Sequence, residues 1–75
     1  MPGMALGVVK VWHMEEGWGV IASLELPPGH DAWSHFSLIL AEGYRCLEPG
    51  DRVEFEPVRR SQDGYDFVAT DVRKL

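Results

Sequence analysis

A chain of 75 residues is long enough for one small domain and too short for two. Hydrophobic residues make up 45% of it and charged residues 25%, a composition that excludes an intrinsically disordered chain. Charged residues such as Lys10 and Glu25 interrupt each apolar stretch after a few positions, so a membrane span is excluded. The net charge of −5 argues by itself against nucleic-acid binding, because cationic side chains supply most of the affinity for phosphate.

The distribution of charge is uneven. Residues 1–44 carry one cation, Lys10, against five acidic residues, whereas residues 45–75 carry six cations against seven acidic residues. A basic patch must therefore draw on the second half of the chain. The single cysteine, Cys46, cannot form an internal disulfide, and the N-terminus lacks the charged and apolar regions of a secretory signal. Both features fit a reducing cytoplasm.

Short alternating or β-branched runs, separated by Gly, Pro and Asp, predict strands throughout the chain. In residues 5–13, simple alternation puts Val9 and Val11 on one face and Lys10 and Trp12 on the other. Residues 14–17 predict a hairpin turn with Gly17 at positive φ, and residues 18–24 predict the second strand. The Pro- and Gly-rich segment 26–31 predicts a loop.

The second half of the chain continues this pattern. It predicts a third strand over residues 32–36, a helical turn over 37–40 and a tight turn over 48–51. A fourth strand over 52–58 and a fifth over 65–72 are joined by a polar hairpin loop, 59–64, with an Asp63-Gly64 turn. Five short strands are not stable as an open sheet with one face bare, so they predict closure into a small barrel. An SH3-like barrel is an alternative on these grounds alone.

Two of the predicted strands carry aromatic residues in an unusual pattern. Trp18 and Val20 share one face of the second strand, and Trp33 and His35 share one face of the third. If these strands are neighbours, the aromatic side chains form a flat platform with Lys10 beside it. Such surfaces bind single-stranded nucleic acid by stacking on its bases. The alternative is that the tryptophans fill a thin core. Against it, an apolar interior is already supplied by Val9, Ile21, Val53 and Phe55.

Several segments closely resemble a bacterial cold-shock domain: residues 7–12, 17–21, 31–37 and 43–56. The resemblance runs from residue 5 to residue 73 and implies one domain over residues 1–75, with an all-β, five-stranded antiparallel barrel of the oligonucleotide-binding type (OB-fold). Residues 16–21, Glu-Gly-Trp-Gly-Val-Ile, look like the family's first ribonucleoprotein motif, and residues 32–36, Ala-Trp-Ser-His-Phe, look like its second.

The resemblance implies a non-enzymatic protein that binds single-stranded DNA or RNA with low sequence specificity, as an RNA chaperone or cold-shock regulator. The residues themselves show no metal-ligand spacing around His30 and His35, no catalytic setting for Cys46 and no phosphate-binding glycine loop, so we expect no metal, no cofactor and no small-molecule substrate. We also expect no membrane partner, and a monomer or weak dimer. The nucleic-acid-binding residues that the resemblance implies are Lys10, Trp12, Trp18, Val20, Trp33, His35, Phe36, Tyr44, Arg59 and Arg60.

The sequence also departs from the family's pattern. Glu16 stands where the first motif has a basic residue, and Val20 stands where it has a stacking phenylalanine. Trp12 lies one place further along its strand than the family's tryptophan, which by alternation turns it to the other face. Ser34 takes a usually apolar inward position and needs a hydrogen-bond partner. We therefore expect weak, salt-sensitive binding, with a protein-docking barrel as the alternative. His13 and His30 are predicted to be solvated loop residues, and Cys46 a buried or half-buried thiol.

Overall fold

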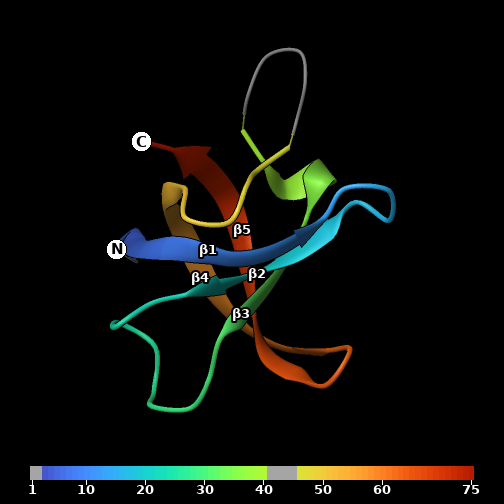
Figure 1. The fold of residues 1–75 in the computed structure, drawn as a ribbon. Coiled ribbons are helices and arrows are strands. Elements are labelled where there is room, and N and C mark those ends of the chain that lie inside the picture. The colour runs from blue at the N-terminus through green and yellow to red at the C-terminus, as the bar shows by residue number, and fades with distance from the viewer. Residues whose placement is uncertain (1–2, 41–45) are drawn as a thin grey trace.

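The chain folds into a closed barrel of five strands (Figure 1). The computed structural model describes residues 3–40 and 46–75. The elements are β1 (Ala5–His13), β2 (Trp18–Ala22), β3 (Ala32–His35), a 3-10 helix η1 (Phe36–Leu38), β4 (Arg52–Gln62) and β5 (Tyr65–Lys74). The strand order around the barrel is β1-β2-β3-β5-β4, and every pairing is antiparallel except that of β3 with β5. The predicted five-stranded barrel is confirmed. None of the described helices is long and apolar enough to cross a membrane.

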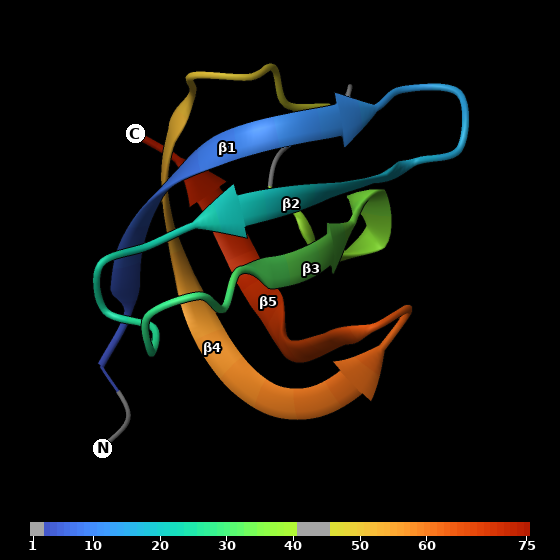
Figure 2. The same ribbon diagram turned by 60° about the horizontal axis from the view of Figure 1, so that its bottom comes forward.

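Strand β1 is shared between two neighbours. Its first part, Ala5 to Val8, pairs with β4, and the part from Val8 to His13 pairs with β2 (Figure 2). Beyond the end of β2, two side chains replace the missing strand. The Ser23 hydroxyl donates to the Leu6 carbonyl oxygen at 2.5 Å, and the Leu6 N–H donates to a Glu25 carboxylate oxygen at 2.6 Å. The backbone groups of Leu6 are thereby paired on the side where β2 has ended.

A β-bulge interrupts the alternation of β1. Val9 pairs with Ile21 but Val11 pairs with Val20, so Lys10 is the extra residue of β1 between these two pairs. A bulge reverses the sequence of inward and outward side chains beyond it. Val9 is buried and Trp12 packs against the core, whereas Val11 falls on the outer face. The prediction that Val9 and Val11 share a face, opposite Trp12, is therefore wrong.

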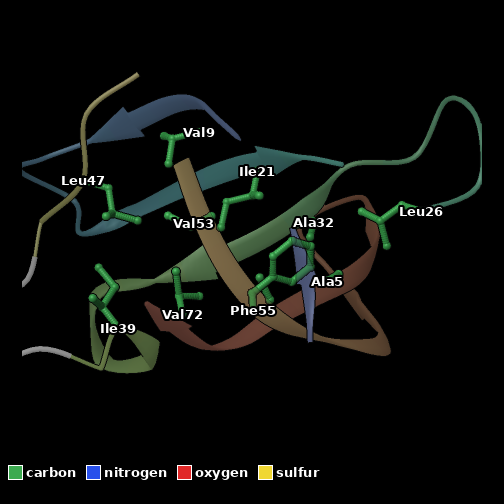
Figure 3. Close-up of a cluster of buried hydrophobic side chains, with 11 residues drawn as sticks. Ala5, Val9, Ile21, Leu26, Ala32, Ile39, Leu47, Val53, Phe55 and Val72 are labelled. Carbon is green, nitrogen blue, oxygen red and sulfur yellow. The ribbon is translucent and has the colours of Figure 1, made fainter. Parts of the chain in front are cut away.

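The core lies between the two ends of the barrel and draws on all five strands (Figure 3). The predicted interior residues Val9, Ile21, Val53 and Phe55 are each 2% exposed or less. The other buried members of the core are Ala5, Leu26, Ala32, Ile39, Leu47, Ala69 and Val72. Ser34 is fully buried, and its hydroxyl donates to the Ala69 carbonyl oxygen at 3.0 Å. The predicted need for a partner is thus met inside the barrel.

The ends of the elements differ from the prediction in several places. Strand β4 continues through residues 59–62, so the predicted loop over 59–64 is wrong, and only the Asp63-Gly64 turn joins it to β5. Strand β2 ends at Ala22, and Phe36 begins η1 instead of ending β3. The turns were predicted correctly: Gly17 has a φ of 80°, and the Asp51 N–H donates to the Glu48 carbonyl oxygen at 3.0 Å. Cys46 is half-buried, as predicted.

Candidate nucleic-acid interface

Strand pairing sets which side chains share the outer face of β1, β2 and β3. Val20 lies opposite both Val11 and Trp33, and Trp18 lies opposite both His13 and His35. Directly opposed residues of neighbouring antiparallel strands project from the same face of a sheet. These side chains therefore leave the barrel on its outer side. Their neighbours along the strands, such as Gly19 and Ser34, face inward and are buried.

Five rings follow one another across this outer face, and we call them the aromatic row: His13, Trp18, Trp33, His35 and Phe36. Ring centroids are separated by 4.2 Å between His13 and Trp18, and by 6.5 Å between Trp18 and Trp33. The separation is 6.0 Å from Trp33 to His35 and 4.4 Å from His35 to Phe36. The planes of Trp18, Trp33 and His35 are nearly parallel, within 18° from one ring to the next. Half-exposed, nearly parallel rings offer flat faces on which bases can stack.

Local backbone contacts hold the end of the aromatic row formed by His35 and Phe36. The Phe36 N–H donates to the Gly17 carbonyl oxygen at 2.8 Å, which ties the start of η1 to the β1–β2 hairpin. A side chain at Gly17 would meet the Phe36 ring at 2.7 Å, so glycine leaves the room that this ring needs. The His35 side chain caps η1, because its Nδ1 accepts from the Ser37 N–H at 3.3 Å.

The charges near the aromatic row are few and mostly acidic. Lys10 Nζ lies 2.9 Å from a carboxylate oxygen of Asp31, while 57% of the lysine side chain stays exposed. The hydrogen bond and the charge of Asp31 raise the pKa of Lys10 above its ordinary value, so its ammonium stays charged at neutral pH. At the hairpin, a carboxylate oxygen of Glu16 lies 3.9 Å from His13 Nδ1. Among the described residues, no group of three His, Cys, Asp or Glu side chains could hold a metal ion.

The structure brings together some of the predicted site residues and separates others. Trp18, Trp33, His35 and Phe36 lie in the aromatic row. Val20 belongs to the same face, opposite Trp33, but it is only 3% exposed and offers little surface to a ligand. Trp12 lies on the inner side of the sheet, where its ring covers Gly19 and packs against the core.

The two predicted arginines of the second half are both exposed on β4, a strand that carries no ring of the aromatic row. The Arg59 guanidinium carbon lies 6.0 Å from the centre of the Phe67 ring, which itself packs partly against the core. His30 meets the same ring edge-on at 5.9 Å and has Nδ1 3.1 Å from an Asp66 carboxylate oxygen. Arg60 is exposed on β4. Tyr44 lies outside the described residues.

His13 is the member of the aromatic row that the sequence analysis missed. Its side chain was predicted to be solvated in a loop, although the predicted first strand, residues 5–13, already included it. His13 ends β1, and its ring lies on Trp18. The length of the predicted turn would have indicated the position of His13. A connection over residues 14–17 places His13 directly opposite Trp18, and opposed residues share a face.

The sequence of this barrel matches known proteins over nearly its whole length. The family model described as "'Cold-shock' DNA-binding domain" matches residues 5–75, nearly the whole chain. The chain belongs to the cold-shock domain family. The major cold shock protein of Micrococcus luteus is 43% identical to this cold-shock domain over 73 residues, which cover 96% of this chain and all of that protein.

Two further relatives match over shorter ranges. The major cold shock protein of Streptococcus pyogenes is 39% identical over 65 residues, or 87% of this cold-shock domain and 91% of that protein. The cold shock-like protein CspLB of Listeria monocytogenes is 44% identical over 55 residues, or 73% and 79% respectively. The resemblance found in the sequence is thereby confirmed. Membership makes this cold-shock domain a non-enzymatic nucleic-acid-binding protein.

Proposed function

We propose that this cold-shock domain binds single-stranded DNA or RNA with low sequence specificity, by stacking bases on the aromatic row. We further propose that it acts in the cytoplasm as an RNA chaperone or cold-shock regulator, as a monomer or weak dimer. The observation that carries the proposal is the run of nearly parallel rings through Trp18, Trp33 and His35 on one exposed face. Rings that served only to fill the core would face the interior of the barrel.

Stacking accounts for the low sequence specificity, because every base has a flat π-face. The spacing of the rings supports the engagement of successive bases by Trp18 and Trp33, whose centroids are 6.5 Å apart. Phe36 extends the row beyond His35. Each stacked base is expected to contribute roughly 1–3 kcal/mol.

Lys10 supplies the cation beside the aromatic row. Its ammonium is paired with Asp31 in the free protein, so a phosphate group must compete with that carboxylate. Glu16 adds a further negative charge at the hairpin. Binding is therefore expected to be weak and to fall steeply as salt screens the remaining attraction. Arg60 is exposed and remains a candidate for an additional phosphate contact.

The experiment that tests the proposal is a titration of tryptophan fluorescence with a short oligothymidine, at low and at near-physiological salt. We expect saturable quenching that weakens with salt. Trp18→Ala and Trp33→Ala should each weaken binding by roughly 1–3 kcal/mol while the barrel stays folded. The control variant is Leu24→Ala, because Leu24 is fully exposed on the loop that follows β2.

The absence of any response at low salt would contradict the proposal. It would favour the alternative in which the exposed rings dock another protein, a role in which tryptophan is common. Glu16 and the buried Val20 are the two residues that favour this alternative. Unfolding of both tryptophan variants would instead mean that these side chains belong to the core, and circular dichroism distinguishes that case.

A further inference from the structure

The outer face of β1, β2 and β3 is short of permanent positive charge. Lys10 is the only lysine or arginine in residues 3–40, and its ammonium lies 2.9 Å from the Asp31 carboxylate. Two of the five rings in the aromatic row, however, are imidazoles. Histidine is the side chain that ordinarily gains its positive charge just below neutral pH. Charge can therefore be added to this face by protons.

The two imidazoles of the aromatic row differ in the charge of their neighbours. His35 Nδ1 accepts a hydrogen bond from the Ser37 N–H, and a backbone N–H can only donate. The Ser37 hydroxyl oxygen lies 2.9 Å from the same nitrogen. Both partners of His35 Nδ1 are therefore uncharged groups.

His13, in contrast, has a carboxylate as its neighbour. Its Nδ1 faces a carboxylate oxygen of Glu16 at 3.9 Å, and 39% of its side chain is exposed. Of the elements packed against it, β2 contributes the uncharged Trp18, so Glu16 is the charged group that faces this ring in the described part of the chain. At 3.9 Å this contact is too long for a hydrogen bond, but it places an anion beside the ring. His13 is therefore the imidazole of the aromatic row with an anionic neighbour, whereas the groups beside His35 Nδ1 are uncharged.

We propose, on the basis of the proposed function, that His13 binds a phosphate group of the nucleic acid as its imidazolium. Its ring lies 4.2 Å from that of Trp18, beside the position that a stacked base would occupy. The imidazole takes one proton from solvent, and its N–H then donates to a phosphate oxygen in competition with Glu16. Binding is consequently coupled to the uptake of a proton and strengthens as the pH falls.

The test compares affinities for a short oligothymidine at about pH 6 and about pH 8, which bracket the ordinary titration of histidine. One additional phosphate contact increases the salt slope by about 0.7 for a single strand and raises the affinity at ~0.1 M salt by roughly fivefold. We expect this gain for the wild-type protein at the lower pH. His13→Gln should bind equally at both values.

His30→Gln is the matched control, because His30 lies against Phe67 and Asp66 and is not part of the aromatic row. It should keep the wild-type ratio between the two pH values. Circular dichroism at both values checks that each variant is folded, and His13→Asn serves if His13→Gln is not. A pH ratio that survives in the folded His13 variant would overturn the inference while leaving base stacking intact. No binding at either pH would overturn the proposed function, and this inference with it.

A second measurement reads the proton directly. In nuclear magnetic resonance, the titration of the His13 ring protons should move to higher pH when the oligonucleotide is saturating, because linkage is reciprocal. The His30 ring protons should titrate as they do in the free protein. A His13 titration unmoved by saturating ligand would overturn the inference.

Discussion

Gly19 is the residue of β2 whose missing side chain leaves room for the Trp12 ring on the inner side of the sheet. It faces inward between Trp18 and Val20, and the Trp12 ring lies directly over it on the inner side of the sheet. The absence of a side chain therefore lets one tryptophan close the barrel while its neighbour Trp18 stays outside. A family motif explains why glycine is expected here, and the contact with Trp12 explains what the glycine does in this chain.

A methyl group at position 19 would overlap both the Trp12 ring and the Val11 carbonyl oxygen. Because a backbone oxygen cannot move aside easily, Gly19→Ala should destabilise the protein by about 1–3 kcal/mol. Denaturant unfolding followed by tryptophan fluorescence measures this loss. Gly3→Ala is the control, since nothing lies within 4 Å of the added methyl group there, and it should change the stability by less than about 0.5 kcal/mol. Equal stability of the two variants would contradict the described packing of Trp12.

Several site residues could be placed from the sequence, because their positions follow from alternation within one strand. Trp18 and Trp33 are examples, and each projects from the face that alternation gives it. Trp12 and His13 were harder, because their orientation depends on the bulge at Lys10 and on pairing with β2. For Val20 the face was predicted correctly, but its burial was not, because alternation gives the face of a residue and not how deeply its side chain is covered.

The β1–β2 hairpin is the element that sets the charge next to the aromatic row. It carries His13 at one end and Trp18 at the other, with Glu16 in the turn between them. The Glu16 side chain is 68% exposed, so its carboxylate is available to repel an approaching phosphate. The hairpin thus combines a stacking ring with an opposing charge.

Replacing this charge should strengthen binding. Glu16→Lys is expected to raise the affinity for oligothymidine and to increase its salt slope by about 0.7 if the lysine gains one phosphate contact. Titrations at several salt concentrations measure the slope. Glu48→Lys makes the same change of charge at an exposed position in a turn that carries no ring of the aromatic row. A salt slope unchanged in Glu16→Lys would mean that the nucleic-acid backbone does not pass this hairpin.

At the scale of elements, the number of strands and their order along the chain were predictable, because turn residues separate the apolar runs. The lengths of β4 and β5 were not predictable in this way. Residues 59–62 are polar and lack the alternation of a half-buried strand, yet they continue the ladder that pairs Arg59 with Phe67 and Gln62 with Tyr65. Backbone hydrogen bonding extends this hairpin beyond the core, and the pattern of side chains does not predict this extension.

The molecule as a whole places its apolar and aromatic side chains on two sides of one sheet. The core is enclosed by all five strands, and the aromatic row lies outside three of them. The net charge of −5 acts on the entire barrel, whereas attraction to phosphate rests on a few local cations. Salt therefore acts on folding and on binding through different sets of charges.

Raising the salt concentration should consequently have opposite effects on stability and affinity. Screening reduces the repulsion among the excess acidic groups, so the melting temperature should rise by about 2–5 °C between low and near-physiological salt. Over the same range the affinity for single strands should fall. Thermal unfolding and fluorescence titration in the same buffers measure the two effects. A melting temperature that falls with salt would mean that attractive ion pairs, and not repulsion, dominate the folded state.

The pairing of Leu6 with two side chains bears on how copies of the protein behave together. Where β2 ends, the N–H and carbonyl of Leu6 would form an open strand edge, bordered by the exposed side chains of Leu6 and Val8. An open apolar edge recruits strands from other molecules and leads to aggregation. Ser23 and Glu25 occupy both hydrogen-bonding groups and put a carboxylate at the edge. Two polar side chains of one loop thereby protect a concentrated solution of the protein against intermolecular sheet growth.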